Sequence, residues 1–222
     1  MSKILIPSSG PDAWQKFLAK PNLQWVTGYS ARTLAYSWEA ASGLPPEIAD
    51  LTNAAFGPGA LLFAIPEHKT ALPGGKRESQ SDVFALVRHE SGLATYTIEG
   101  KVDEPFGPTM DEWMLDASDG KRERLDFILG LLGIAHCPGD IRYQLLHRKA
   151  SALVEAERFD AKLAGMIVHS FSPESRWREE FDRFVSLIGL VYNEEEPLRL
   201  EVPSGKTLML GWASGDQIFR SV

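Results

Sequence analysis

The sequence predicts an α/β protein, because apolar runs of strand length alternate with segments whose apolar residues recur at helical spacing. The strand-like segments are 60–66, 82–101 and 163–171, and the helical segments between and before them are 31–41 and 140–159. A short polar stretch, His89 to Gly92, divides the segment 82–101 into two runs, which is typical of a β-hairpin. We therefore expect helices packed on a sheet that contains this hairpin.

The N-terminal half predicts three further elements and a cap for the helix 31–41. Residues 11–20 form a short amphipathic helix, and Ser30 is placed to cap the helix 31–41. A brief helix at 46–53 precedes the first strand, and a glycine-rich loop at 72–77 leads from that strand to the hairpin.

The C-terminal half predicts four helices and three strands. Thr109 caps a short helix to about residue 117, and a second helix over 120–132 ends at Gly133. Asp140 caps the longest helix, and Ser172 caps a helix that begins at Pro173. In this last helix Trp177 is expected on the buried face. The segments 163–171, 198–202 and 208–213 are the strands.

Composition places the chain among single-domain globular proteins. The chain has 222 residues, 44% of them hydrophobic and 24% charged, which suffices for one core over residues 1–222. It contains no apolar run long enough for a membrane span, and the apolar stretch near Met1 is too short for a secretory signal. Together with the single cysteine, Cys137, this predicts a cytoplasmic protein with no membrane partner. The net charge of −7 excludes a broadly basic surface but leaves room for a local basic strip.

The open end of the hairpin gathers charge. Asp82 opens the first strand, while Glu99 and Lys101 close the second. Because the strands are antiparallel and side chains alternate between faces, the two carboxylates and the ammonium converge at one edge of the sheet. Carboxylate oxygens suit Mg²⁺, and a neighbouring lysine can orient water or offset charge on a phosphorane. The alternative interpretation is a solvated cross-strand charge cluster.

Asp, a gap and then Glu-x-Lys at a strand end resembles the PD-(D/E)xK (restriction-endonuclease-like) nuclease superfamily. Its core order of helix, three strands, helix and strand matches residues 30–171, with a helical insertion at 109–133. Ser81 stands where many members have proline. The chain is also similar to a bacterial family without an assigned activity, in which the stretches Gly-Gly-x-Arg, Ser-Gln-Ser-Asp, Glu-Gly-Lys and Arg-Tyr-Gln-Leu-Leu-His-Arg recur.

The resemblance implies a mixed central sheet and a Mg²⁺ (or Mn²⁺) site. Asp82 and Glu99 would hold the metal, with the carbonyl of Gly100 as a further ligand, and Lys101 would position the attacking water. Such folds often draw a third acid from the first helix or the first strand. Two residues of this chain qualify, Glu39 and Glu67.

Substrate-binding candidates lie on the helix 140–159 and in two basic groups. Gln144, His147, Arg148 and Ser151 form one polar stripe at i, i+3, i+4 and i+7, and members of the superfamily place a glutamine or basic residue there. Arg142, at the start of this helix, and Arg77, in the glycine-rich loop, complete the set. The alternative for the stripe is a solvated helix face.

The predicted function is metal-dependent hydrolysis of phosphodiester bonds in nucleic acid, with DNA favoured over RNA and a homodimer allowed by the resemblance. The alternative is a catalytically inactive nuclease-fold module for binding or assembly. The sequence leaves open whether the substrate is single-stranded or double-stranded. Because the site residues are expected at the edge of the sheet, we also expect Glu99→Gln to leave the fold nearly intact.

Overall fold

The computed structural model describes residues 4, 9–191 and 197–222. Its centre is one six-stranded sheet with the strand order β1-β2-β3-β4-β6-β5. The strand β2 pairs antiparallel with both β1 and β3, the strands β3, β4 and β6 run parallel, and β5 pairs antiparallel with β6. The strand bounds are β1 Gly59–Thr70, β2 Ser79–His89, β3 Gly92–Lys101, β4 Leu163–Ser170, β5 Leu198–Glu201 and β6 Thr207–Ser214. The prediction of an α/β protein with a mixed sheet is therefore confirmed.

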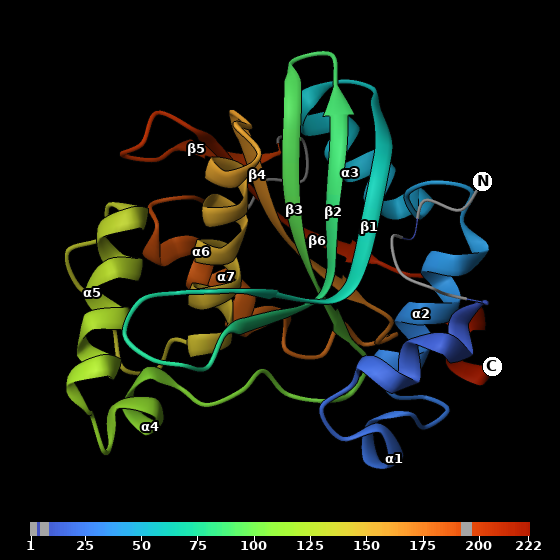
Figure 1. Cartoon of the computed structure of the whole chain (residues 1–222), viewed down its shortest axis with the longest axis horizontal. Helices are drawn as coiled ribbons and strands as arrows, with labels where there is room; N and C mark the ends of the chain where they lie inside the picture. The colour runs from blue at the N-terminus through green and yellow to red at the C-terminus, as the bar shows by residue number, and fades with distance from the viewer. Residues whose placement is uncertain (1–3, 5–8, 192–196) are drawn as a thin grey trace.

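Helices cover both faces of the sheet (Figure 1). On one face lie the 3₁₀ helix η1 (Pro11–Phe17), α2 (Ser30–Ala40) and α3 (Pro46–Phe56). The other face carries α4 (Met110–Met114), α5 (Asp119–Leu132), α6 (Tyr143–Arg158) and α7 (Arg178–Leu187). Two short elements complete the described chain, α1 (Pro21–Gln24) and the 3₁₀ helix η2 (Gln217–Ser221). No helix among the described residues has the length and apolar character needed to cross a membrane.

Each face of the sheet has its own apolar core because the strand side chains alternate. Val83, Tyr96 and Ile98 point towards α2 and α3, where they meet Trp38 and Leu34. On the opposite face, residues of β4 and β6 pack with α6 and α7. The buried residues there include Met166, Val168, Leu208, Leu146, Phe181 and Phe184.

Two helix ends match their predicted signals. Thr109 and Glu112 form a reciprocal capping box at the start of α4, and Gly133 ends α5 in the left-handed conformation. Both signals act through local backbone geometry, so the sequence alone is sufficient to place them. The two helices occupy the predicted insertion at 109–133, and α5 packs beside α6.

The predicted starts of the last two long helices were wrong. α6 begins at Tyr143 after Arg142, which makes no side-chain cap, and the predicted cap Asp140 lies upstream in a turn. α7 begins at Arg178, because the chain first makes a turn in which Ser172 Oγ accepts the backbone N–H of Arg176 at 3.2 Å.

Trp177 was expected on the buried face of this last helix. It instead precedes α7, with a left-handed φ of 68°, and is only partly buried. The aromatic rings of α7 that lie fully inside the core are those of Phe181 and Phe184.

Candidate functional site

The charged residues of the hairpin meet where β2 and β3 separate. The β2–β3 ladder runs from His89 opposite Gly92 to Val83 opposite Ile98, and the chain beyond it carries Asp82 and Glu99. The carboxylate of Asp82 accepts the backbone N–H of Gly100 at 2.8 Å, which fixes the first acid against the second strand. Asp82, Glu99 and Lys101 line one pocket, as the antiparallel pairing predicts.

Glu99 is buried and fully engaged. Its Oε1 accepts Lys101 Nζ at 2.9 Å and Gln144 Nε2 at 2.6 Å, and its Oε2 accepts Arg148 Nε at 2.7 Å. The exposed fractions of Glu99, Lys101 and Arg148 are 3%, 5% and 7%, respectively. This cluster is therefore not a solvated charge pair, and the premise behind the expectation for Glu99→Gln, a side chain at the open edge of the sheet, does not hold. Removing one member of a buried ion pair leaves an uncompensated charge.

The helix α6 presents part of its polar stripe to this cluster. Gln144 also accepts the backbone N–H of Gly107 at 3.1 Å, so it ties the exit of β3 to the helix. Arg148 donates from Nη1 to Ser79 Oγ at 3.3 Å, and Ser151 donates to the same oxygen at 2.7 Å. The stripe thus faces β2 and β3 rather than solvent, which removes the alternative of a solvated helix face.

A third acid enters the site from β1. Glu67 adopts a left-handed φ of 52°, unusual for a residue with a side chain, and its carboxylate accepts Gln80 Nε2 at 2.6 Å. The β1–β2 ladder pairs Pro66 with Val83 and His68 with Ser81 but does not include Glu67. Backbone strain of this kind concentrates at functional sites.

The three acids of the site fall into two classes by the direction in which their pKa values are shifted. Burial opposes ionisation of Glu99, but Lys101 and Arg148 outweigh it and hold the pKa of Glu99 below its usual value. Burial raises the pKa of Asp82 to about 7, and the negative charge of Glu99 adds to this. Burial, reinforced by Asp82, raises the pKa of Glu67 to about 8. Within the described chain, no lysine or arginine forms an ion pair with Asp82 or Glu67.

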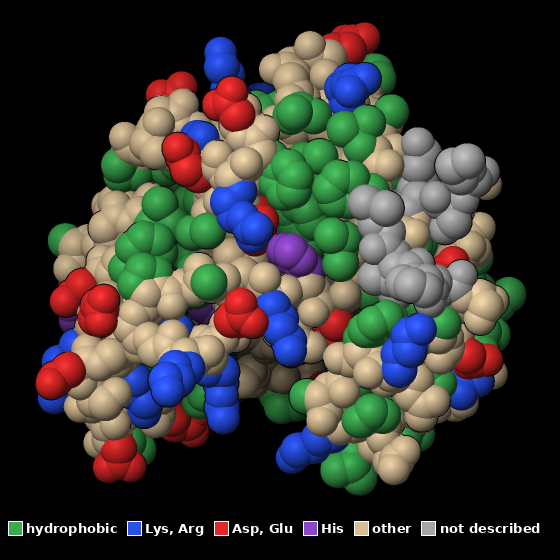
Figure 2. Space-filling view, viewed as in Figure 1, with side chains coloured by type: hydrophobic (Ala, Val, Ile, Leu, Met, Phe, Trp, Pro, Cys, Tyr) green, Lys and Arg blue, Asp and Glu red, His purple; other side chains and the backbone are tan. Residues whose placement is uncertain are grey.

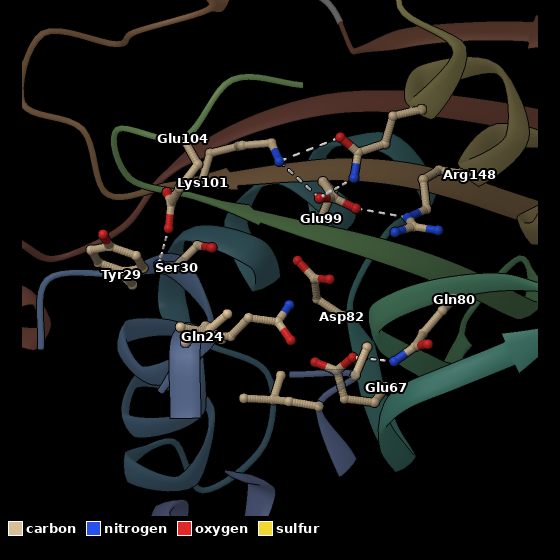
Figure 3. A pocket seen from close by; sticks show the side chains of 15 residues that line it. Gln24, Tyr29, Ser30, Glu67, Gln80, Asp82, Glu99, Lys101, Glu104 and Arg148 are labelled. Atoms are coloured by element: carbon tan, nitrogen blue, oxygen red, sulfur yellow. Dashed lines mark hydrogen bonds and ion pairs between the residues drawn. The ribbon is translucent and has the colours of Figure 1, made fainter. Parts of the chain in front are cut away.

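These acids lie in a cavity of about 420 Å³ that the N-terminal helices close from one side. In Figure 3, Asp82 and Glu67 point into the hollow from the strands, Lys101 and Glu99 lie above them, and Gln24 faces them from α1. Figure 2 shows the surface hollowed below the sheet, with Lys and Arg side chains along the edges of the hollow. The cavity has the size of a small-ligand site.

Four predicted residues lie elsewhere. Glu39 accepts Trp14 Nε1 at 2.8 Å and does not line the cavity. His147 is held by Ser79 through Nδ1 at 2.8 Å, and burial with the nearby Arg148 lowers its pKa well below the usual value. Arg142 forms an ion pair with Glu180. Arg77 is exposed in the loop between β1 and β2.

Several residues of the cavity were not predicted. They are Gln24, Tyr29, Ser30, Gln80 and Glu104, together with the apolar side chains of Leu18 and Leu23. Gln80 had a usable signal, because it lies two positions before Asp82 on the same strand. The others follow no pattern in the sequence, since η1, α1 and the start of α2 reach the site only through tertiary packing.

The ligand set fits a hard cation with few protein ligands. No group of three or more His, Cys, Asp or Glu side chains in the described parts of the chain is arranged to hold a metal. Mg²⁺ needs fewer, because it keeps several waters and binds through one or two carboxylates and a substrate phosphate. Asp82 and Glu67, acids without a paired cation, meet that requirement, whereas Glu99 already accepts three donors.

Fold and site together define an α/β protein with an acid-lined pocket at one end of its sheet. A family model described as Domain of unknown function (DUF6946) matches residues 7–217. The chain therefore belongs to the DUF6946 family. No curated protein and no solved structure matches it.

Proposed function

We propose that this protein is a Mg²⁺- or Mn²⁺-dependent hydrolase of phosphodiester bonds in nucleic acid, with DNA as the expected substrate. One observation carries the proposal: Asp82 and Glu67 face a shared cavity without a paired cation, beside the buried Lys101–Glu99 pair. A bound divalent cation would supply the missing positive charge. Lys101 lies on the wall of the same cavity, where a phosphoryl group would meet it.

The order of elements supports the same conclusion. The chain contains α2, β1 to β3, α6 and β4 in the order of the restriction-endonuclease-like core, with α3 inserted before β1 and α4 and α5 inserted before α6. The helices α2 and α6 cover opposite faces of the sheet. The acids and the lysine come from β1, β2 and β3, and Arg148 and Gln144 come from α6. The Lys and Arg side chains around the hollow in Figure 2 favour a polyanionic substrate.

Each residue has a distinct role in the proposed reaction. Asp82 and Glu67 would hold the metal, which would polarise the phosphoryl oxygen and lower the pKa of an attacking water. Lys101 would donate hydrogen bonds to the water and to the charge that develops on the phosphoryl oxygens. Glu99 orients the Lys101 ammonium, and Arg148 in turn fixes Glu99. The water oxygen forms the new bond to phosphorus while the bond to the leaving oxygen breaks, and that oxygen takes up a proton.

One observation favours a second candidate function. Both carboxylate oxygens of Glu99 are occupied by Lys101, Gln144 and Arg148, so the acid of the Glu-x-Lys motif is less available to a metal than the resemblance implies. A catalytically inactive binding or assembly module that kept the fold would show the same arrangement.

A calorimetric Mn²⁺ titration combined with a hydrolysis assay distinguishes the two functions. The wild type should bind the ion and cleave at least one member of a panel of single- and double-stranded DNA and RNA. Lys101→Ala should still bind Mn²⁺ but cleave ~100-fold more slowly, because it removes the group that positions water and stabilises charge and leaves Asp82 and Glu67 in place. It also leaves Arg148 as the cation paired with Glu99, so circular dichroism is used to check that the variant is folded at the assay temperature. Lys76→Ala, in the exposed loop between β1 and β2, is the matched lysine control. A wild type that binds no metal and cuts nothing would establish the binding module.

A further inference from the structure

The rim of the cavity carries exposed apolar side chains opposite the acids. Leu23 in α1 and Tyr29 before α2 both line the cavity, yet 67% and 47% of their surfaces are exposed. Single exposed apolar residues are ordinary on a protein surface, but apolar residues gathered at a polar cavity mark a binding site. Neither side chain belongs to the two buried cores.

A hydrogen-bonded link fixes Tyr29 relative to the charged end of the site. The backbone N–H of Ser30 donates to Glu104 Oε1 at 2.8 Å, and the other oxygen of Glu104 accepts the backbone N–H of Val102 at 3.1 Å. Glu104 therefore joins the first turn of α2 to the residue that follows Lys101. Figure 3 shows Tyr29, Ser30 and Glu104 together on one side of the hollow, with Asp82 and Glu67 across from them.

We infer that the cavity takes one unstacked nucleotide of single-stranded DNA, with its base against the ring of Tyr29 and Leu23 and its phosphodiester towards Asp82 and Lys101. This inference rests on the proposed function and adds the substrate class to it. Proteins that bind single strands combine charged contacts to the backbone with aromatic side chains on which bases stack. The cavity supplies both kinds of contact within one small volume.

An intact duplex does not match this cavity. Its bases are paired and stacked, so a base reaches a closed pocket only after it leaves the stack, at a cost in free energy that is least for a single strand. Here the acids line a cavity of about 420 Å³ that residues following η1, together with residues of α1 and the start of α2, close on one side. The single strand is therefore the substrate that the geometry favours.

The test compares hydrolysis of one oligodeoxynucleotide as a single strand and as a blunt duplex in the presence of Mn²⁺. The wild type should cleave the single strand at least ~10-fold faster. Tyr29→Ala should raise KM for the single strand by about tenfold, in the range expected for losing one stacking contact, while Tyr29→Phe retains the ring and the wild-type KM. Leu115→Ala is the control, because Leu115 is 79% exposed but does not line the cavity.

A binding measurement makes the outcome independent of cleavage. With Ca²⁺ in place of Mn²⁺, fluorescence of a single 2-aminopurine in the oligonucleotide should be quenched by wild type and by Tyr29→Phe, and not by Tyr29→Ala. Equal cleavage of both strand forms, or a Tyr29→Ala variant that matches the wild type, would overturn the inference and leave metal-dependent hydrolysis standing. Tyr29-dependent quenching by a protein that hydrolyses nothing would overturn the proposed hydrolysis and keep the nucleotide pocket.

Discussion

Glu155 of α6 accepts hydrogen bonds from side chains of β1, and Glu67 belongs to that strand, yet the environments of the two acids differ in kind. Glu155, on α6, accepts His68 Nε2 at 3.0 Å and Thr70 Oγ1 at 2.8 Å, and it pairs with Arg158 at 3.0 Å. Burial opposes its ionisation, but these partners outweigh it and lower its pKa. Glu67 has one amide donor, and its pKa rises to about 8.

This difference distinguishes an acid that stabilises the fold from acids that do not. His68 and Thr70 lie on one face of β1, where they supply partners to an acid of the packed helix, while Glu67, which precedes His68, lines the cavity. Side chains of β1 and α6 therefore compensate the charge of the buried Glu155. The described chain leaves Asp82 and Glu67 without a cation, which is destabilising unless a ligand supplies one.

The largest expected effect comes from Asp82. Asp82→Asn keeps an oxygen for the N–H of Gly100 but removes a metal-binding charge, so phosphodiester hydrolysis should fall ~1000-fold, in keeping with the several kcal/mol that a bound metal contributes. The melting temperature of the metal-free protein should stay the same or rise, because one of two repelling acids is gone. Initial rates and a thermal melt measure both. A marked loss of stability would place Asp82 with Glu155, among the structural acids.

Glu99→Gln should act mainly on stability. The substitution leaves Arg148 and Lys101 buried beside a neutral amide, which should destabilise the protein by roughly 3 kcal/mol. Urea unfolding monitored by circular dichroism gives this value, and Gln144→Ala, which removes neutral hydrogen bonds to Glu99 and Gly107 but no charge, is the comparison. Unfolding at the wild-type midpoint would mean that Glu99 is not the electrostatic centre of the cluster.

Glu155→Gln should separate the two kinds of acid. Because it weakens the bonds from His68, Thr70 and Arg158, we expect a loss of about 1–2 kcal/mol in the free energy of unfolding. Mn²⁺ affinity should not change, since Glu155 does not line the cavity. Weaker metal binding of this variant in calorimetry would contradict the division between the structural acid Glu155 and the cavity acids Asp82 and Glu67.

The last expected effect is the pH dependence of the metal-free protein. The folded pKa values of Asp82 and Glu67, about 7 and about 8, exceed the ordinary values of roughly 4, so between these limits the native state binds more protons than the unfolded state. Their contribution to stability is therefore lost as pH rises towards 8. In EDTA, the melting temperature of the wild type should fall relative to that of Asp82→Asn between pH 5 and pH 8. If the melting temperatures of the wild type and Asp82→Asn change in parallel with pH, the pKa of Asp82 in the folded protein is not raised.

The sequence by itself determined the parts of the site that are close along the chain. The polar turn at 89–92 and the alternation of side chains bring Asp82 near Gly100 and place Glu99 beside Lys101, because strand pairing and a period of two are local rules. The cap at Thr109 and the end at Gly133 are local in the same sense. Asp140 and Ser172 carried equally good capping signals, and packing overrode them.

Tertiary structure alone decided what surrounds these residues. Arg148 lies 49 positions from Glu99 in the sequence, and only the docking of α6 on β3 turns it from a polar surface residue into the buried partner of that acid. Glu67 and Tyr29 meet Asp82 in one cavity because β1 kinks at a left-handed residue and the N-terminal helices fold over the end of the sheet. No periodicity encodes such contacts, since they depend on how separate elements pack in three dimensions.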